Sequence, residues 1–245
     1  MKFGGIQRLT LIDYPQEMAC IVFTRGCNFR CGYCHNASLV VGEKGSDGNG
    51  LAQTIDEQEV LAFLEKRKNI LSGVVVSGGE PLLSDGIEQF IERVKALGYL
   101  VKLDTNGTSP EKLKRLIEKD LIDYVAMDIK NSPQKYAQTV GVANLDLSSI
   151  DESIKIIMNS EKLKNYEFRT TVVGPYFEVS DFDEIGKWIN GAKAYYLQSF
   201  RDSGDILINR NEKLSELTLG EYSHSAMQTF LSTVKTYVPN AKLRD

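Results

Sequence analysis

The chain has 245 residues, of which 42% are hydrophobic and 25% charged, so it is long enough to bury a substantial core. Its formal net charge of −4 gives no sign of a general affinity for nucleic acid or for an anionic membrane surface. The N-terminus lacks the long apolar stretch of a signal peptide, and no apolar run approaches the length of a transmembrane helix. These features predict a cytoplasmic protein that binds neither nucleic acid nor membrane, in a compartment where thiols stay reduced.

Short apolar runs rich in β-branched residues recur along the chain and are typical of strands buried on both faces. Amphipathic stretches lie between them, and this alternation indicates a parallel sheet with right-handed crossovers. Six such units are too few for an eight-stranded barrel. We therefore expect an α/β fold, a partial (β/α)6 TIM-like barrel with a parallel sheet; a flat doubly wound sheet is the alternative that spacing does not exclude. The expected strands cover residues 18–24, 73–77, 99–104, 123–129, 166–173 and 194–199.

Signals for helix starts and ends accompany the stretches between these runs. Thr54–Glu57 and Ser149–Glu152 have the Ser/Thr-x-x-Glu pattern of a capping box, which predicts a helix start at each. The other expected helices follow Ser109–Pro110, run from Ile87 to a stop at Gly98, follow a cap at Ser180 over 181–190, and lie near 219–237.

The chain is expected to form a single domain over 1–245, with a core over about 18–200 and a helical extension over about 205–245. The segment 41–50 is glycine-rich and polar, but it has neither the Lys-Ser/Thr ending of a P-loop nor the acidic spacing of a calcium loop. We expect it to be a mobile loop beside the cysteines, with a role as a lid or partner contact left open.

Three of the four cysteines, Cys27, Cys31 and Cys34, lie within eight residues. In a reducing compartment such thiols are more typical of a metal site or a reactive thiol than of a disulfide framework, whereas Cys20 lies in an apolar run and is expected in the core. A structural zinc site needs four ligands, and His35 is poorly placed to share one ion with its neighbour. Closely spaced thiolates bind iron–sulfur clusters, and three of them leave one iron of a cubane cluster open to a small molecule.

Polar, glycine-rich or charged residues follow nearly every expected strand. The carboxyl ends of parallel strands meet at one edge of the sheet, where active sites of such folds lie. We therefore expect these residues to surround one site. In chain order they are the three cysteines, Ser77–Pro81, Asp104–Gly107, Asp128–Lys130, Arg169 within the fifth strand, and Gln198, Ser199 and Arg201.

The pattern Cys27-xxx-Cys31-x-Tyr33-Cys34 resembles the signature of the radical S-adenosylmethionine (SAM) superfamily, and the resemblance continues through Gly78-Gly79-Glu80-Pro81 over roughly residues 18–200. Within that superfamily, CHN (34–36), SGGEPL (77–82), DTNG (104–107) and MDIK (127–130) resemble the activases of glycyl radical enzymes. The segments IQRLTLIDYP (6–15) and CNFRCGYCHN (27–36) are most similar to the anaerobic ribonucleoside-triphosphate reductase activating proteins.

The resemblance implies the radical SAM fold, a [4Fe-4S] cluster on Cys27, Cys31 and Cys34, and SAM on the open iron. It implies reductive cleavage of SAM to a 5′-deoxyadenosyl radical, which abstracts a hydrogen from a glycine of a partner enzyme. The cofactors carry this chemistry, so no further catalytic residue is expected. The implied partner is a glycyl radical enzyme, with anaerobic ribonucleotide reductase favoured, and the implied electron donor is a flavodoxin or ferredoxin.

The resemblance also assigns contacts with SAM to individual positions. Two glycines would permit close approach of the backbone to the methionine amino group, and a glutamate would fix their loop. Charged groups would bind the methionine ammonium, the ribose hydroxyls and the methionine carboxylate. The positions are Gly78 and Gly79, Glu80 for the loop, Asp104 for the ammonium, Asp128 for the ribose, Lys130 for the carboxylate, Tyr33 and His35 beside the adenine, and Arg169 near SAM.

Other functions fit parts of the sequence. Pyruvate formate-lyase activases carry a histidine near the end of the sixth strand, where this chain has Phe200, so that departure disfavours a pyruvate formate-lyase-type activase. With Cys20 alone left over, the chain also lacks cysteines for the additional clusters of some activases. The remaining alternatives are a radical SAM enzyme acting on a small molecule, such as a deazapurine synthase with a closed polar pocket, an iron–sulfur electron carrier, and a zinc-stabilised binding module.

Overall fold

A computed structural model of the protein describes residues 1–41, 54–202, 204, 206–210 and 218–244, so the expected loop at 41–50 lies outside the described residues except for Val41. Eight strands form one sheet in the order β10-β9-β8-β7-β6-β5-β3-β2, and two short strands, β1 and β4, pair separately. The strands are β1 (Lys2–Phe3), β2 (Gly5–Thr10), β3 (Ala19–Thr24), β4 (Ile55–Asp56), β5 (Gly73–Gly78), β6 (Leu100–Thr105), β7 (Tyr124–Asp128), β8 (Asn165–Val172), β9 (Tyr195–Ser199) and β10 (Lys242–Arg244).

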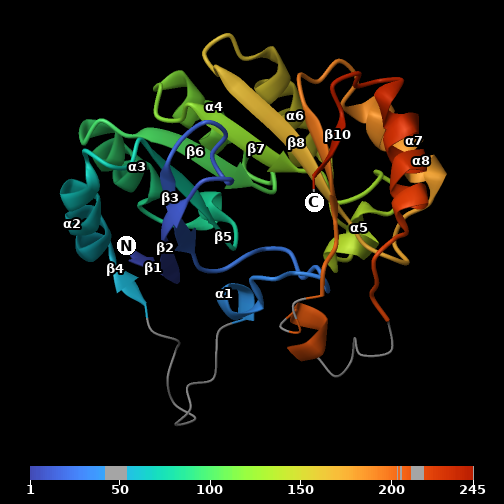
Figure 1. The fold of residues 1–245 in the computed structure, drawn as a ribbon, viewed down its shortest axis with the longest axis horizontal. Helices are drawn as coiled ribbons and strands as arrows, with labels where there is room; N and C mark the ends of the chain where they lie inside the picture. Colours follow the sequence, from blue (N-terminus) through green and yellow to red (C-terminus); the bar gives the residue numbers. More distant parts are fainter. Residues whose placement is uncertain (42–53, 203, 205, 211–217, 245) are drawn as a thin grey trace.

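Helices lie along the outer side of the curved sheet, as Figure 1 shows for α2, α3 and α4 on one flank and α7 and α8 on the other. Within the described part of the chain, no helix is both long and apolar enough to cross a membrane. The α-helices are α1 (Ala37–Val41), α2 (Glu57–Arg67), α3 (Ile87–Ala96), α4 (Pro110–Glu118), α5 (Tyr136–Val140), α6 (Ser148–Asn159), α7 (Val179–Trp188) and α8 (His224–Lys235), with 3₁₀ turns η1 (Pro81–Leu83) and η2 (Leu207–Arg210).

The predicted parallel α/β architecture is confirmed. All six expected strands form, as β3, β5, β6, β7, β8 and β9, and each pairs in parallel with the next along the sheet. Their boundaries agree with the apolar runs to within one residue at every end, because a strand buried on both faces ends where polar residues begin.

Two strands of the sheet were not predicted. Strand β2 pairs antiparallel with β3 at one edge, and β10 pairs in parallel with β9 at the other. Residues Gln7 to Leu9 of β2 are exposed, and β10 has three residues, none of them buried. Neither segment has the continuous apolar pattern that made the central strands recognisable, since an edge strand has one side toward solvent.

The two faces of the sheet have different chemistry. On β3, Cys20 and Val22 belong to the main hydrophobic core beneath the helices, which confirms the prediction for Cys20. The alternate residues Ala19 and Ile21 face the inside of the curved sheet, where they form a small cluster with Tyr14 and others. Side chains on a strand alternate between faces, so each strand contributes to both.

Inside the curved sheet, charged side chains are buried in pairs. The carboxylate of Glu167 on β8 is 0% exposed, and the two terminal nitrogens of Arg244 each lie 2.8 Å from one of its oxygens. The hydroxyl of Tyr124 donates to the same carboxylate at 2.8 Å, and the Arg244 guanidinium carbon lies 3.7 Å from the ring centroid of Tyr196. Nearer the middle of the sheet, the ammonium of Lys102 pairs with Asp104. Buried charges are stable in this form because each has a partner.

Several predicted helix caps are wrong. The Thr54 capping box does not form, because Ile55 and Asp56 pair with β1 as strand β4 and α2 begins only at Glu57. The Glu57 carboxylate instead bonds the amino group of Met1 and, at 2.8 Å, the guanidinium of Arg93.

Two further helices begin earlier than predicted. Helix α6 starts at Ser148, whose backbone N–H and hydroxyl donate to the Asp146 carboxylate, so the capping box at Ser149–Glu152 does not form. Helix α7 starts at Val179 rather than after a cap at Ser180, and the Asp181 carboxylate accepts the backbone N–H of Glu178 at 2.8 Å. At α4, Pro110 is in the first turn as predicted, but the Ser109 side chain makes no capping bond.

Replacing Arg244 with alanine removes the partner of a fully buried carboxylate. We expect Arg244→Ala to lower the free energy of unfolding by about 3 kcal/mol, as for other buried pairs that lose one member. Lys155→Ala, which breaks an exposed i,i+4 pair with Asp151, is the matched control and should cost less than about 0.5 kcal/mol. Urea unfolding of both variants measures the difference, and equal effects would contradict the assignment.

Candidate functional site

The loop that carries the three cysteines runs from the end of β3 to α1 and is fixed by backbone contacts with distant segments. The N–H of Arg30 donates to Val140 O at 2.7 Å, and the N–H of Ile208 donates to Gly32 O at 2.8 Å. The carbonyl of Cys34 accepts the N–H of Leu207 at 3.2 Å. Two parts of the chain that are far apart in sequence, at Val140 and at Leu207–Ile208, therefore hold the cysteine loop in place.

The end of β5 packs directly against the cysteine loop through two glycines. The N–H of Gly79 donates to Thr24 O at 3.1 Å, and the N–H of Glu80 donates to Gly26 O at 2.8 Å. A Cβ on Gly79 would lie 1.9 Å from that same Gly26 oxygen, and Gly78 has φ +121°, a conformation open mainly to glycine. The close approach seen at these glycines is thus between two backbone segments.

The carboxylate of Glu80 joins the end of β5 to the end of β6. It is 0% exposed and accepts hydrogen bonds from the N–H of Leu82 at 3.2 Å, the hydroxyl of Thr105 at 2.8 Å and the N–H of Asn106 at 2.7 Å. Burial raises the pKa of Glu80 to about 7, although these three donors lower it in part. Glu80 therefore fixes its own loop, as the sequence predicted, and fixes its neighbour as well.

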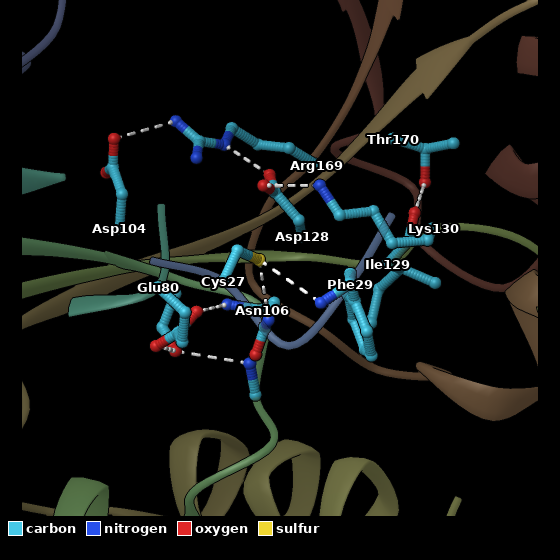
Figure 2. A network of polar contacts seen from close by, with 12 residues as sticks. Cys27, Phe29, Glu80, Asp104, Asn106, Asp128, Ile129, Lys130, Arg169 and Thr170 are labelled. Atoms are coloured by element: carbon cyan, nitrogen blue, oxygen red, sulfur yellow. Dashed lines mark hydrogen bonds and ion pairs between the residues drawn. The ribbon is translucent and has the colours of Figure 1, made fainter. Parts of the chain in front are cut away.

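A line of alternating charges crosses the site between three strands (Figure 2). Arg169 Nε lies 3.0 Å from Asp128 Oδ1, and one of its terminal nitrogens lies 3.5 Å from Asp104 Oδ2. Lys130 Nζ lies 3.0 Å from the other oxygen of Asp128. The hydroxyl of Ser77 donates to Asp104 at 3.1 Å. Arg169 thus bridges two carboxylates that belong to β6 and β7.

These neighbours keep the groups ionised although they are buried. Burial alone raises the pKa of Asp128, but Arg169 and Lys130 together bring it down to about 2. Burial likewise opposes ionisation of Asp104, whose pKa is held below its usual range by Arg169 and Lys102. Burial would lower the pKa of Lys130, but Asp128 raises it well above the usual range. The network therefore presents fixed charges to the cavity.

The twelve residues to which the resemblance gives a ligand or contact role line one cavity of about 410 Å³. They come from the cysteine loop, the ends of β5, β6 and β7 and the middle of β8, so these residues converge at one edge of the sheet as predicted. They are Cys27, Cys31, Tyr33, Cys34, His35, Gly78, Gly79, Glu80, Asp104, Asp128, Lys130 and Arg169. Of the residues expected at the end of the sixth strand, Gln198 lines the cavity, whereas Ser199 and Arg201 do not.

The three thiols differ in exposure, but burial raises the pKa of each of them. Burial raises the pKa of Cys31 to about 12, with Lys130 opposing it, and also raises the pKa of Cys27 and Cys34. Backbone N–H groups of Phe29 and Asn36 donate to the sulfurs of Cys27 and Cys34 and partly offset this. A metal that binds these sulfurs as thiolates would release their protons.

Two aromatic side chains border the cavity in different ways. Tyr33 is 4% exposed, packs beside Tyr176 with ring centroids 6.1 Å apart, and its hydroxyl has no hydrogen-bond partner among the described residues. His35 is exposed, and its ring centroid lies 5.6 Å from that of Phe200, the residue noted in place of a histidine. Tyr33 therefore buries an unsatisfied hydroxyl near the charged groups of the site.

Sequence analysis gave no role to three residues that also line the cavity. Asn36 donates its side-chain amide to Gly78 O at 2.9 Å, and Asn106 contacts the cysteine loop. Both stand inside quoted motifs, so their position was a usable signal. Asp13, which accepts the hydroxyl of Thr10, lies in the quoted segment 6–15, but that segment precedes the first expected strand and nothing in the sequence placed it beside the site.

The residues fit the cofactors that the sequence implies. Three thiols line one cavity, and no group of three His, Cys, Asp or Glu side chains in the described ranges converges on a single-ion position. This arrangement suits a cluster, in which each thiolate binds a different iron, better than it suits zinc. The orphaned Tyr33 hydroxyl and the fixed charges of Asp128 and Lys130 would suit a polar, zwitterionic ligand next to it.

Comparisons with known proteins agree with this chemistry. The family model described as "Radical SAM superfamily" matches residues 21–189. A Methanocaldococcus jannaschii protein named "Putative glycyl-radical enzyme activating enzyme" is 32% identical over 246 residues, which cover 98% of this chain and 95% of that protein. The pyruvate formate-lyase-activating enzyme of Listeria monocytogenes is 35% identical over 152 residues, covering 58% of this chain and 59% of that enzyme.

A solved structure shows the same fold. Streptococcus suis SuiB is similar with a TM-score of 0.64 at 14% identity. The alignment covers 93% of this chain and 49% of SuiB, so the chain spans about half the length of that structure. At this level of identity the similarity concerns the fold alone.

The close backbone approach at Gly79 predicts that any side chain there is disruptive. Gly79→Ala would force its Cβ against the Gly26 carbonyl, so we expect a loss of about 1–3 kcal/mol in the free energy of unfolding. Gly5→Ala is the control, because its Cβ would meet nothing closer than Phe23 at 3.9 Å. Denaturant unfolding of the two variants provides the test, and a Gly79→Ala protein as stable as Gly5→Ala would refute the contact.

The raised pKa of Glu80 predicts a pH-dependent contribution to stability. The unfolded carboxyl titrates near 4.5 and the folded one near 7, so the folded state holds the proton more tightly between these values. The stabilisation is full below about pH 4.5 and is lost as the pH rises through 7, by a total on the order of 3 kcal/mol. We expect the melting temperature of the wild type to fall relative to Glu80→Gln over this range, at one fixed cluster loading. If the melting temperature of the wild type minus that of Glu80→Gln stays constant or rises between pH 4.5 and 7, the raised pKa of Glu80 is contradicted.

Proposed function

Because the chain belongs to the radical SAM superfamily and is an enzyme of that family, we propose that it activates a glycyl radical enzyme. The observation that carries the proposal is the convergence of three thiols, a Gly-Gly-Glu turn and an Asp–Arg–Asp–Lys charge network on one cavity. Similarity over nearly the full length to a relative named for glycyl-radical enzyme activation supports the choice among radical SAM reactions.

The superfamily implies a [4Fe-4S] cluster and SAM as cofactors, which supply one-electron reductive cleavage of SAM and abstraction of a hydrogen atom. In the proposed site, Cys27, Cys31 and Cys34 hold the cluster. Lys130 provides a fixed positive charge for the methionine carboxylate, and Asp128 provides acceptors for the ribose hydroxyls.

The remaining side chains of the site position these groups. Arg169 keeps Asp104 and Asp128 ionised, so that the Asp104 carboxylate can accept from the methionine ammonium. Glu80 holds the Gly78–Gly79 turn against the cysteine loop, which limits movement between the cluster and SAM. Tyr33 and His35 border the place proposed for the adenine, where the Tyr33 hydroxyl would gain a partner. No protein group is needed as acid or base, because the reaction moves a hydrogen atom.

The proposed substrate is a backbone glycine on a loop of a partner enzyme, and the favoured partner is anaerobic ribonucleoside-triphosphate reductase. The similarity of residues 6–15 and 27–36 to activating proteins of that reductase supports this partner. The buried Phe200 supports it as well, because pyruvate formate-lyase activases resemble this chain but carry a histidine there. A flavodoxin or ferredoxin is the proposed electron donor.

The assignment of three cluster ligands predicts a sharp difference among the four cysteines. Alanine at Cys27, Cys31 or Cys34 should abolish reductive cleavage of SAM, because each substitution removes one thiolate of the cluster. Cys20→Ala should retain cleavage within about twofold, since Cys20 is packed in the core on the other face of β3. Assays of 5′-deoxyadenosine formation on reconstituted proteins measure the effect. Loss of cluster iron and of cleavage in a folded Cys20→Ala protein, equal to the loss in the other three variants, would overturn the ligand set.

The partner is tested by forming the radical directly. The reconstituted, reduced protein is mixed anaerobically with SAM and with either anaerobic ribonucleotide reductase or pyruvate formate-lyase. Electron paramagnetic resonance should detect a glycyl radical on the reductase, with one 5′-deoxyadenosine formed per radical. A signal on pyruvate formate-lyase alone would replace the proposed partner. Formation of 5′-deoxyadenosine with no glycyl signal on either protein would favour a small-molecule substrate.

A further inference from the structure

The side chain of Asn106 lies between the end of β6 and the first cysteine. It is 5% exposed, and its Nδ2 lies 2.9 Å from Asn28 Oδ1 and 3.9 Å from Cys27 Sγ. Figure 2 shows Asn106 beside Cys27, with a dashed line from its amide to the Cys27 sulfur. The sulfur also accepts the backbone N–H of Phe29 at 3.3 Å. Cys27 therefore has one backbone donor and one side-chain donor directed at it.

The orientation of the Asn106 amide follows from its other contacts. Its Oδ1 faces the backbone N–H of Thr108 at 3.0 Å and the Thr108 hydroxyl at 2.7 Å. A backbone N–H can only donate, so the atom facing it must be the carbonyl oxygen, and the NH₂ group must face Asn28 and Cys27. The backbone N–H of Asn106 is held by Glu80 at 2.7 Å. Contacts of the backbone N–H and of the side-chain oxygen of Asn106 thus fix the position of its NH₂ group.

We propose that Asn106 is a positioning residue that sets the reduction potential of the cluster through its hydrogen bond to Cys27. This inference rests on the cluster of the proposed function. Hydrogen bonds to ligating sulfurs are among the factors that set iron–sulfur potentials, because they stabilise the added negative charge of the reduced state. One electron enters from an external reductant, and the Cys27 thiolate stays bound throughout. The amide makes that electron easier to accept.

Glu80 helps to hold the Asn106 amide close to Cys27. Its carboxylate holds both the N–H of Asn106 and the hydroxyl of Thr105, and its own N–H bonds Gly26 at the start of the cysteine loop. A shift of the β6 end relative to the cysteine loop would therefore have to break these bonds before it could draw the amide away from Cys27.

The test is a redox titration of the loaded protein, with the reduced cluster followed by electron paramagnetic resonance. Asn106→Leu keeps a similar size but removes the donor, and its midpoint potential should be more negative than that of the wild type. Thr108→Val is the matched control: it removes the hydroxyl contacts with the Asn106 oxygen and with the Asn28 amide but leaves the Asn106 amide and the Thr108 N–H, and its midpoint should stay close to the wild-type value.

An Asn106→Leu midpoint equal to that of the wild type, at the same iron content, would overturn the proposal. Equal negative shifts in both variants would also overturn it, because loss of packing would then suffice. If the leucine variant does not hold iron, Asn106→Ser, whose side chain is too short to reach the sulfur, is judged by the same criteria. The titration needs neither SAM nor a partner enzyme. A wild type that forms no cluster would therefore contradict the proposed function, whereas unshifted variants would contradict this inference alone.

Discussion

The guanidinium of Arg169, held between the carboxylates of Asp104 and Asp128, is the interaction on which the arrangement of the site depends. A cation in this position is stable only with paired anions, and two carboxylates on neighbouring strands would repel each other without it. Each carboxylate also pairs with a lysine: Asp128 with Lys130 at the cavity, and Asp104 with Lys102 deeper inside the sheet. The inside of the curved sheet consequently holds paired charges beside a small apolar cluster, whereas the outer face holds the main apolar core.

This division explains how the protein combines a rigid scaffold with a polar, reactive centre. The helices and the outward side chains of the strands bury the apolar area that stabilises the fold. The inward side chains are then free to be charged, provided that each has a partner. The loops at the strand ends are tied to one another by Glu80 and by backbone bonds from the cysteine loop to Val140 and Ile208. Ligands bound there would meet groups whose positions are already fixed.

The sequence predicted the central strands and the convergence of their ends because both follow from local patterns: continuous apolar runs, and polar motifs directly after them. It did not predict β2 or β10, because these edge strands lack the continuous apolar pattern of the central strands. The predicted helix cap was wrong where the capping side chain makes a tertiary contact instead, as Glu57 does with Met1 and Arg93. For the same reason it could not show that Gly79 approaches Gly26, or that Asn106 faces Cys27, since these contacts join loops of different strands.

The central claim is that a 5′-deoxyadenosyl radical, formed from SAM in the cavity at the strand ends, abstracts a hydrogen atom from a glycine of a partner protein. Isotope transfer tests it most directly, with the partner prepared from glycine deuterated at the α-carbon and 5′-deoxyadenosine analysed by mass spectrometry after reaction. The account predicts one deuterium in the 5′-deoxyadenosine for each glycyl radical formed. 5′-Deoxyadenosine that carries no deuterium, formed alongside a radical on the partner, would contradict it.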